Sequence, residues 1–159
     1  MAGVTSAGTG RVRRMDGALD EIDRRIIAEL EADGRLSGRA LAERVAISRA
    51  NAYARLDRLV AEKVITGFTA LVDPIRVGLT TSAYVTLSVR QNSWRDLKER
   101  LAGIPEIKHM ALTGGEYDVM LLVRAADNNA LRRVVLERLQ AMPEVLSTRT
   151  NLIFEDAAN

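Results

Sequence analysis

The side chains with the clearest capacity for chemistry are the arginines and polar residues between positions 35 and 63. This segment holds seven basic and three acidic groups, whereas residues 68–159 hold eleven of each. Because the whole chain has a net charge of only +2, the positive charge is concentrated in one short stretch. Such a concentration is typical of a surface that contacts phosphate, although a solvated helical face has the same composition.

A helix is predicted within this segment, from Ser48, a favourable N-cap residue, to about Lys63. Apolar residues line one side of it at helical spacing, and Asn51, Ala54 and Arg58 project from the opposite side. Asparagine can pair with adenine, arginine with guanine or phosphate, and alanine permits close approach to a major groove. The first N–H groups of the helix suit a backbone phosphate. The residues predicted to contact DNA are Ser48, Arg49, Asn51, Ala54, Arg55 and Arg58.

Two shorter patterns precede this helix and would position it. Apolar spacing predicts a first helix that begins near Leu19 and a second, capped by Ser37, that ends near Val45. About three residues then connect the second helix to the third, which is the helix-turn-helix arrangement. Glycine is more usual than Ala46 at this turn, because alanine tolerates a left-handed backbone poorly. A plain three-helix packing unit, or one that docks protein, would show the same periodicity.

The second half of the chain contains an internal repeat. Residues 99–107 and 137–145 are identical at five of nine positions, with an offset of 38 residues. In each copy a helix stops before a proline and a strand follows, because proline cannot continue a helix. Strand patterns occupy residues 81–89, 107–112, 119–123 and 145–154, with helices capped by Ser93 and Asp127 between them. This β-α-β-β-α-β order is that of a ferredoxin-like sandwich.

The strand predicted at residues 119–123 is apolar on both faces, since Met120 and Leu122 alternate with three branched apolar residues. Helices cover one face of a ferredoxin-like sheet, so an apolar second face predicts a symmetric partner chain. Residues 68–72 also alternate loosely, and we expect them to form a strand that links the two halves.

Composition excludes several other classes of protein. The chain has no cysteine and a single histidine, His109, which excludes thiolate zinc sites, cysteine nucleophiles and two-histidine metal motifs. We expect no metal and no cofactor. An enzyme would have to draw its acid–base groups from His109, Glu116, Tyr117 and Asp118. His109, however, alternates with apolar residues on a predicted strand, and a packed, hydrogen-bonded histidine is the favoured interpretation.

The chain also lacks sequence features of membrane insertion or secretion. Its longest strongly apolar run, residues 119–123, is too short to cross a bilayer. Residues 1–18, which we expect to be a flexible arm, lack the apolar centre of a secretory signal. The sequence therefore predicts a cytoplasmic protein without membrane contact.

Five groups of residues occur in a fixed order along the chain. They are Leu19-Asp20-x-x-Asp23-x-x-Ile26-Ile27-x-x-Leu30, Gly34-Arg35-Leu36-Ser37, Leu41-Ala42-x-x-Val45-x-x-Ser48, Arg55-Leu56-x-x-Leu59 with Val64-Ile65-x-Gly67-Phe68, and Thr113-Gly114-Gly115-Glu116-Tyr117-Asp118. In combination they resemble the Lrp/AsnC (feast/famine) transcription regulators over residues 19–154. The resemblance implies a protein that binds operator DNA as a homodimer, and that in many members assembles further into an octamer.

The resemblance also implies an effector, a free amino acid or related metabolite, bound between protomers of the C-terminal domain. Carried over by position, Gly114, Gly115 and Asp118 border this effector on one chain, and Thr148 and Thr150 contribute from a neighbour. Backbone N–H groups beside the glycines can bind a carboxylate, and Asp118 can bind an ammonium group. From the residues alone, a plain β-hairpin turn with glycines at positive φ explains the same segment.

The sequence thus predicts an α+β protein with four parts. These are a flexible arm at 1–18, a winged-helix-like helix-turn-helix DNA-binding domain at 19–66, a linker strand at 67–79, and a ferredoxin-like effector-binding and oligomerisation domain at 80–159. The predicted function is sequence-specific DNA binding that responds to a small metabolite, without enzymatic activity. The alternative is a small-molecule enzyme or metabolite-binding module on the ferredoxin-like domain.

Overall fold

The computed structural model describes residues 18–90 and 94–156. The chain divides into two compact units, residues 1–70 and 71–159, and each is described by itself. The predicted arm, apart from Ala18, and the predicted helix cap at Ser93 lie outside the described residues.

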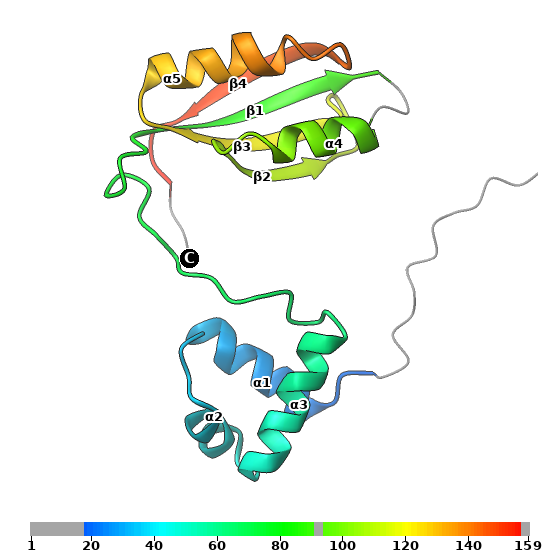
Figure 1. The fold of residues 1–159 in the computed structure, drawn as a ribbon, viewed down its shortest axis with the longest axis vertical. Helices are drawn as coiled ribbons and strands as arrows, with labels where there is room; N and C mark the ends of the chain where they lie inside the picture. The colour runs from blue at the N-terminus through cyan, green and yellow to red at the C-terminus, as the bar shows by residue number, and fades with distance from the viewer. Residues whose placement is uncertain (1–17, 91–93, 157–159) are drawn as a thin grey trace, which may run out of the picture. The chain divides into compact units, whose positions relative to one another are not determined.

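The N-terminal unit is formed by three helices, α1 (Glu21–Ala32), α2 (Gly38–Val45) and α3 (Arg49–Ala61) (Figure 1). The two predicted serine caps are confirmed, since Ser37 Oγ accepts from Ala40 N and Ser48 Oγ accepts from Asn51 N, both at 3.2 Å. The helices enclose a small core in which six apolar residues are buried, namely Ile26, Leu41, Ala42, Val45, Ala52 and Leu59. The helix-turn-helix arrangement predicted from the sequence is therefore present.

The turn between α2 and α3 uses a left-handed residue. Ala46 has φ 59° and ψ 48°, the conformation in which the β-carbon of an L-residue crowds the backbone. It allows Ile47 N to donate to Ala42 O at 3.0 Å, which closes the end of α2. Lys63, just beyond α3, has φ 60°. The sequence correctly identified Ala46 as the position where glycine would be more usual.

The linker strand predicted at residues 68–72 is not formed. These residues lie in no strand of the described chain, and Phe68, Leu71 and Val72 are 57%, 98% and 55% exposed. A strand requires a neighbouring strand to satisfy its backbone N–H and C=O groups, and no described strand of this single chain pairs with the segment. The apolar residues do alternate along this segment, but no described strand of this chain lies beside it to form hydrogen bonds with it.

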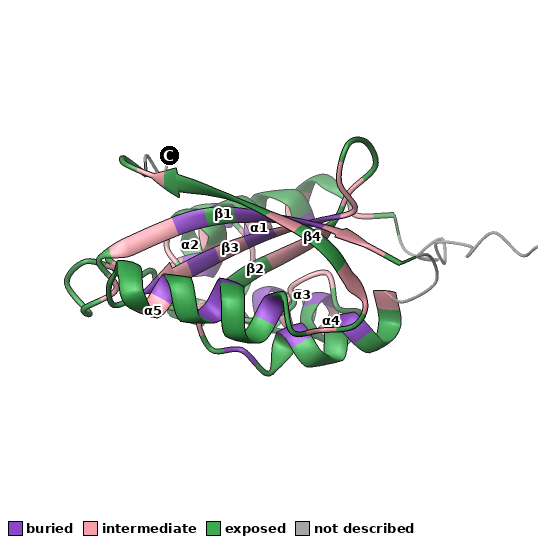
Figure 2. Ribbon diagram, turned by 90° about the horizontal axis from the view of Figure 1, so that it is seen from above, coloured by how far each residue is buried: buried purple, intermediate pink, exposed green. Residues whose placement is uncertain are grey.

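The C-terminal unit has the predicted β-α-β-β-α-β order. Its elements are β1 (Thr81–Val89), α4 (Trp94–Ala102), β2 (Ile107–Leu112), β3 (Val119–Ala125), α5 (Asn128–Arg133) continued by the π-helical η1 (Val134–Leu139), and β4 (Val145–Ile153). The strands form one antiparallel sheet in the order β2-β3-β1-β4. Figures 1 and 2 show α4 and α5 on the same face of this sheet, and the ferredoxin-like prediction is confirmed.

The internal repeat appears as repeated hydrogen bonds. Ile104 N donates to Leu101 O at 3.0 Å, and its counterpart 38 residues later, Met142 N, donates to Leu139 O at 3.2 Å. The first residues of β2 and β4 likewise bond to the third residue before them, at 3.1 and 3.0 Å. Both prolines thus follow a helix end that the backbone closes in the same way. Asp127 caps α5 as predicted, accepting from Ala130 N at 2.7 Å.

Strand β2 differs from its prediction at His109. A bulge between Ile107 and His109 shifts the register against β3, so that His109 pairs with Leu122 on the face opposite the helices. His109 is exposed there. The expectation of a packed histidine is therefore wrong, because strict alternation does not continue through a bulge.

Candidate nucleic-acid interface and candidate effector loop

The first two turns of α3 are largely exposed, because the consecutive residues 48–51 point in different directions around the start of the helix and all lie at the surface. Five of the exposed residues there, which we call the α3 outer face, are Ser48, Arg49, Ala50, Asn51 and Ala54. The opposite side of the helix is fixed by Ala52 and Leu59, which are 1% and 0% exposed. The outer face combines one guanidinium, one amide and small side chains on a capped helix, which suits close approach to a groove.

Arg55 and Arg58, also predicted to contact DNA, are bound within the protein. Arg58 Nη2 lies 2.6 Å from Asp23 Oδ2, and Arg55 Nη1 lies 2.7 Å from Asp20 Oδ2 and 2.8 Å from Asp23 Oδ1. The side chain of Asp23 is only 1% exposed, and a buried carboxylate requires positive partners. Arg58, which was predicted to point away from the apolar stripe, is thus paired with a carboxylate of its own chain, and contact of either arginine with DNA stays a prediction.

These four residues, Asp20, Asp23, Arg55 and Arg58, form what we call the Asp23 cluster. Burial raises the pKa of Asp23, but hydrogen bonds from Arg58, the Asp20 backbone N–H and Arg55 outweigh it and lower this pKa from 3.8 to about 2. The pKa of Asp20 is lowered by the Asp23 backbone N–H and by Arg55. Both carboxylates are therefore ionised at neutral pH, and the cluster contributes no net charge.

Internal pairing also reduces the positive charge available to a partner. Arg39 pairs with Glu43 at 2.9 Å, and Arg44 pairs with Glu29 at 3.0 Å. Among the described residues, the basic side chains of the 35–63 segment that make no ion pair are Arg35, Arg49 and Lys63. Arg49 is the one on the α3 outer face, so it is the principal candidate there for contact with phosphate.

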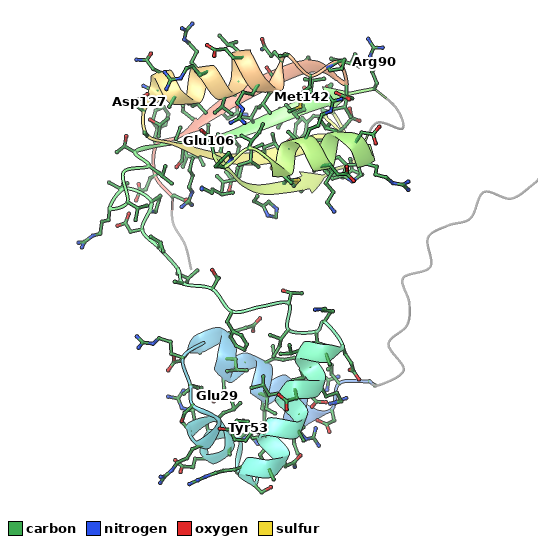
Figure 3. All side chains as sticks on the ribbon, in the orientation of Figure 1. Glu29, Tyr53, Arg90, Glu106, Asp127 and Met142 are labelled. Atoms are coloured by element: carbon green, nitrogen blue, oxygen red, sulfur yellow. The ribbon has the colours of Figure 1, made fainter. Side chains whose placement is uncertain are left out.

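Tyr53 extends this surface toward α2, and sequence analysis did not select it. Its side chain, labelled in Figure 3, is 52% exposed, and its ring occupies the space where a β-carbon on Gly38 would lie. The hydroxyl of an exposed tyrosine can donate to a phosphate oxygen. Its position on the helix, one residue before Ala54, could have indicated that Tyr53 lies at the edge of the same surface.

The predicted effector loop joins β2 to β3. Its base is closed by two bonds from Thr113, whose N donates to Asp118 O and whose Oγ1 donates to Tyr117 O, both at 2.8 Å. Gly114 and Gly115 are exposed, and Gly115 has φ 132°, which favours glycine. The carboxylate of Asp118 accepts from Val89 N at 2.7 Å. One carboxylate oxygen of Asp118, the residue predicted to bind the effector's ammonium group, is therefore already hydrogen-bonded to the end of β1.

A pocket of about 220 Å³ lies beside this loop. Of the five predicted effector residues, only Thr148 lines it, and Gln140 Nε2 donates to its hydroxyl at 2.8 Å. Thr150 is exposed on β4 and does not line the pocket, and neither do Gly114, Gly115 and Asp118. The lining residues that sequence analysis did not assign to an effector are Thr86, Ser88, Glu116, Tyr117, Ser147 and Arg149. Period-two alternation on β1 could have indicated Thr86 and Ser88.

Comparison with known proteins assigns both units to a family. Residues 19–66 match a family model described as winged helix-turn-helix DNA-binding, and residues 82–158 match one described as Lrp/AsnC ligand binding domain. The chain is 37% identical over 159 residues to the HTH-type transcriptional regulator AldR of Mycolicibacterium smegmatis, covering 98% of this chain and 92% of that one. This chain belongs to the Lrp/AsnC family. It is a helix-turn-helix, DNA-binding transcription regulator with a ligand-binding domain.

Other Lrp/AsnC proteins share its sequence or fold. The leucine-responsive regulatory protein of Klebsiella pneumoniae is 31% identical, with 87% of this chain and 86% of that one covered. A transcriptional regulator from Neisseria meningitidis, solved as a complex with L-Met, has a TM-score of 0.82 and 27% identity, with 89% and 94% covered. The leucine response regulatory protein LrpA of Mycobacterium tuberculosis has a TM-score of 0.79 and 33% identity, with 89% and 96% covered.

Two structural features are absent from the described residues of this Lrp/AsnC chain. None of its described helices is both long and apolar enough to span a bilayer. In residues 18–90 and 94–156, no group of three or more histidine, aspartate or glutamate side chains is arranged to hold a metal ion.

Proposed function

We propose that this regulator binds operator DNA by inserting the α3 outer face into a major groove. The observation that carries the proposal is the exposure of Arg49, Asn51 and Ala54 on the first two turns of a capped helix, the part of a recognition helix that contacts base edges. Arg49 binds a phosphate, Asn51 a base, and the alanines leave room for the groove. Arg55 and Arg58 contribute indirectly, because their ion pairs with Asp20 and Asp23 hold α3 against α1.

Single substitutions on α3 test this proposal. We expect Arg49→Ala and Asn51→Ala each to weaken binding to a selected duplex by about tenfold or more, and Arg49→Ala also to reduce the salt dependence by about one phosphate contact. Arg39→Ala is the matched control, because Arg39 lies on α2 and pairs with Glu43. The measurement is the affinity of each variant and of the wild type for the duplex over a range of salt concentrations. Equal losses in all three variants, or wild-type protein without sequence preference, would contradict the proposal.

We further propose that the C-terminal domain binds a free amino acid as its effector. The pocket beside the loop contains an ion pair between Arg149 Nη1 and Glu116 Oε1 at 3.2 Å, with side chains 66% and 71% exposed. Such an exposed pair is weak in water, and a zwitterion offers a carboxylate to the arginine and an ammonium to the glutamate. The predicted set Gly114, Gly115, Asp118, Thr148 and Thr150 remains part of this proposal, with the loop N–H groups as additional donors.

Thermal-shift measurements with the individual amino acids test the effector proposal. At least one amino acid should raise the melting temperature of the wild type, because a ligand stabilises the state that binds it. Arg149→Ala should abolish that shift, whereas Arg138→Ala, which removes an exposed arginine paired with Glu106, should retain it. An undiminished shift in Arg149→Ala would place the ligand elsewhere.

The assembly that we propose is a homodimer, which can associate further into an octamer. Its support is the sheet face opposite the helices, where Tyr84 is 42% exposed and Met120 and Leu122 are only partly buried. We expect sedimentation to give a dimer or larger species for wild type and a smaller one for Leu122→Glu. The proposed location is the cytoplasm, and the proposed action is binding without catalysis.

A further inference from the structure

Tyr53, the aromatic residue of α3, leans onto the start of α2 (Figure 3). A β-carbon on Gly38, the first residue of α2, would lie 2.5 Å from the Tyr53 hydroxyl oxygen and 2.6 Å from its Cε1. Atoms that are not bonded to each other do not approach so closely. The ring can therefore occupy this position only because residue 38 is glycine, which lets a side chain come close to the backbone.

The Tyr53 hydroxyl is available to a partner outside its own chain. The side chain is 52% exposed, and within residues 18–90 and 94–156 its hydroxyl neither donates nor accepts a protein hydrogen bond. A phenol group can do both. Because the ring already rests on Gly38, a bond to its hydroxyl orders few additional torsions, and less conformational entropy is lost on binding.

Tyr53 lies on the same flank of α3 as Arg49, one helical turn later. Residues four apart are neighbours on a helix surface, and contact with Gly38 shows that this flank faces α2. The opposite flank faces α1. There Arg55 Nε donates to Asn51 Oδ1 at 3.0 Å, and Arg55 Nη1 pairs with the carboxylates of α1 and its cap.

The geometry of helix-turn-helix docking indicates what passes along the Arg49–Tyr53 flank. In such domains the second helix of the pair enters the major groove, while the first helix crosses the DNA backbone. Here the first helix of the pair is α2, and Tyr53 lies between its first residue and the α3 outer face. The backbone of one strand should therefore pass beside the Tyr53 hydroxyl.

We propose that Tyr53 is a second contact to the DNA backbone, beside Arg49, and that Gly38 is a positioning residue that holds the Tyr53 hydroxyl toward a phosphate oxygen. The inference rests on the proposed insertion of the α3 outer face into a major groove. A contact with phosphate carries no sequence information, and a neutral phenol does not neutralise a phosphate charge as a lysine or arginine does. Loss of the hydroxyl therefore weakens binding to every sequence alike and leaves the salt dependence unchanged.

Tyr53→Phe in the full-length protein tests the hydroxyl alone, because phenylalanine keeps the ring on Gly38. Affinity for a duplex selected by the wild type and for a random duplex should fall by the same factor, about fivefold or more. The salt dependence should stay that of the wild type, whereas Arg49→Ala should reduce it. Val60→Ala is the matched control and should bind as the wild type does, because Val60 is partly exposed on the same flank about two turns beyond Tyr53.

Gly38→Ala tests the support under the ring. Alanine favours a helix, so circular dichroism should show an intact fold, but its β-carbon displaces the ring and affinity should fall as in Tyr53→Phe. In a Tyr53→Ala background no ring remains to be displaced, and Gly38→Ala should cause no further loss. Gly34→Ala is the control, because a β-carbon there would lie 3.7 Å or more from its neighbours, and it should bind as the wild type does.

Three results would overturn the inference. The first is wild-type affinity in Tyr53→Phe, and the second is a loss in Tyr53→Phe that depends on the DNA sequence or lowers the salt dependence. The third is an equal loss from Gly38→Ala with and without the Tyr53 ring. If Arg49→Ala and Asn51→Ala lose affinity while Tyr53→Phe does not, this inference alone fails. If all three bind as the wild type does, the proposed placement of α3 in the groove fails as well.

Discussion

The two units of the chain are stabilised by different means. The N-terminal unit buries six apolar side chains, whereas the C-terminal unit buries fourteen. Among the described residues, the buried polar side chains are Asp23 in the first unit and Thr86 in the second. The smaller core is supplemented by the Asp23 cluster, which connects α1 to α3. The larger core needs no charged residue.

This difference bears on function in each unit. Ion pairs have defined geometry, so the Asp23 cluster fixes the rotation of α3 and the orientation of Asn51 as well as adding stability. In the C-terminal unit, packing of β1 and β3 under the helices fixes the sheet, and the loop at residues 113–118 is positioned by backbone bonds at its base. Recognition of DNA should therefore be sensitive to charge, and the fold of the effector domain to side-chain volume.

The largest effect should come from the larger core. Leu121 on β3 is 0% exposed, and Leu121→Ala should lower the free energy of unfolding of the C-terminal unit by about 3–4 kcal/mol. The sole tryptophan, Trp94, packs against this core, so its fluorescence in urea reports the unit directly. The control is Leu112→Ala, at a position that is 55% exposed, which should cost less than about 1 kcal/mol. Similar losses in both variants would contradict this assignment of the core.

The next effect tests the Asp23 cluster. Asp23→Ala leaves two guanidinium groups without their shared carboxylate, and we expect it to destabilise the N-terminal unit by about 2 kcal/mol. Hydrogen exchange of the α3 amides measures this loss, while the Trp94 transition should not move. Glu43→Ala removes an exposed pair with Arg39 and should cost about 0.5 kcal/mol or less. If the two variants lost the same amount of stability, the Asp23 cluster would contribute no more to the N-terminal unit than an exposed ion pair does.

Acid should weaken the N-terminal unit through the same carboxylate. The folded-state pKa of Asp23, about 2, lies below its ordinary value of 3.8. A lowered pKa means that this contribution is complete above roughly pH 5 and is lost as the pH falls toward about 2. Urea unfolding followed by far-ultraviolet circular dichroism should show the gap between wild type and Asp23→Asn closing over that range. A gap that persists at pH 2 would contradict the linkage.

The smallest effect concerns the turn before α3. Ala46→Gly should stabilise the N-terminal unit by about 0.5–1 kcal/mol, because glycine relieves the left-handed strain but adds freedom to the unfolded chain. Ala40→Gly, within α2, should have the opposite sign and a similar size. The same circular-dichroism assay compares them. Destabilisation by Ala46→Gly would show that the alanine methyl group contributes more than the strain costs.

The sequence determined those features that depend on local chemistry. Serine and aspartate caps, prolines that end helices and the 38-residue repeat gave the element order, because each acts within a few residues of itself. The position of Ala46 was likewise predicted from the geometry of the turn. The pairing of Ser48 with Asn51 N at 3.2 Å is an example in which one residue type at one spacing was sufficient.

The features that sequence analysis missed depend on contacts between distant residues. In the sequence, Asp23 looks like an ordinary acidic residue in the first turn of a helix, where it favours the helix dipole. Nothing in the neighbouring sequence indicates that it is buried and bonded to Arg58, 35 residues later. The bulge that exposes His109 depends on the register with β3. The pocket beside Thr148 combines β1, β4 and a loop, and the unformed linker strand lacked a partner. In each case the deciding residue is remote in sequence.

The most direct test of the central claim is the affinity for selected DNA of Ala50→Glu. Ala50 is exposed in the first turn of α3, where a glutamate favours the helix dipole and so should not unfold the domain. Ala28→Glu, at an exposed position of α1, is the matched control. If the α3 outer face contacts DNA, Ala50→Glu should lose at least about a hundredfold in affinity through steric conflict and repulsion of phosphate, and Ala28→Glu should bind as the wild type does. Wild-type affinity in Ala50→Glu would contradict the account.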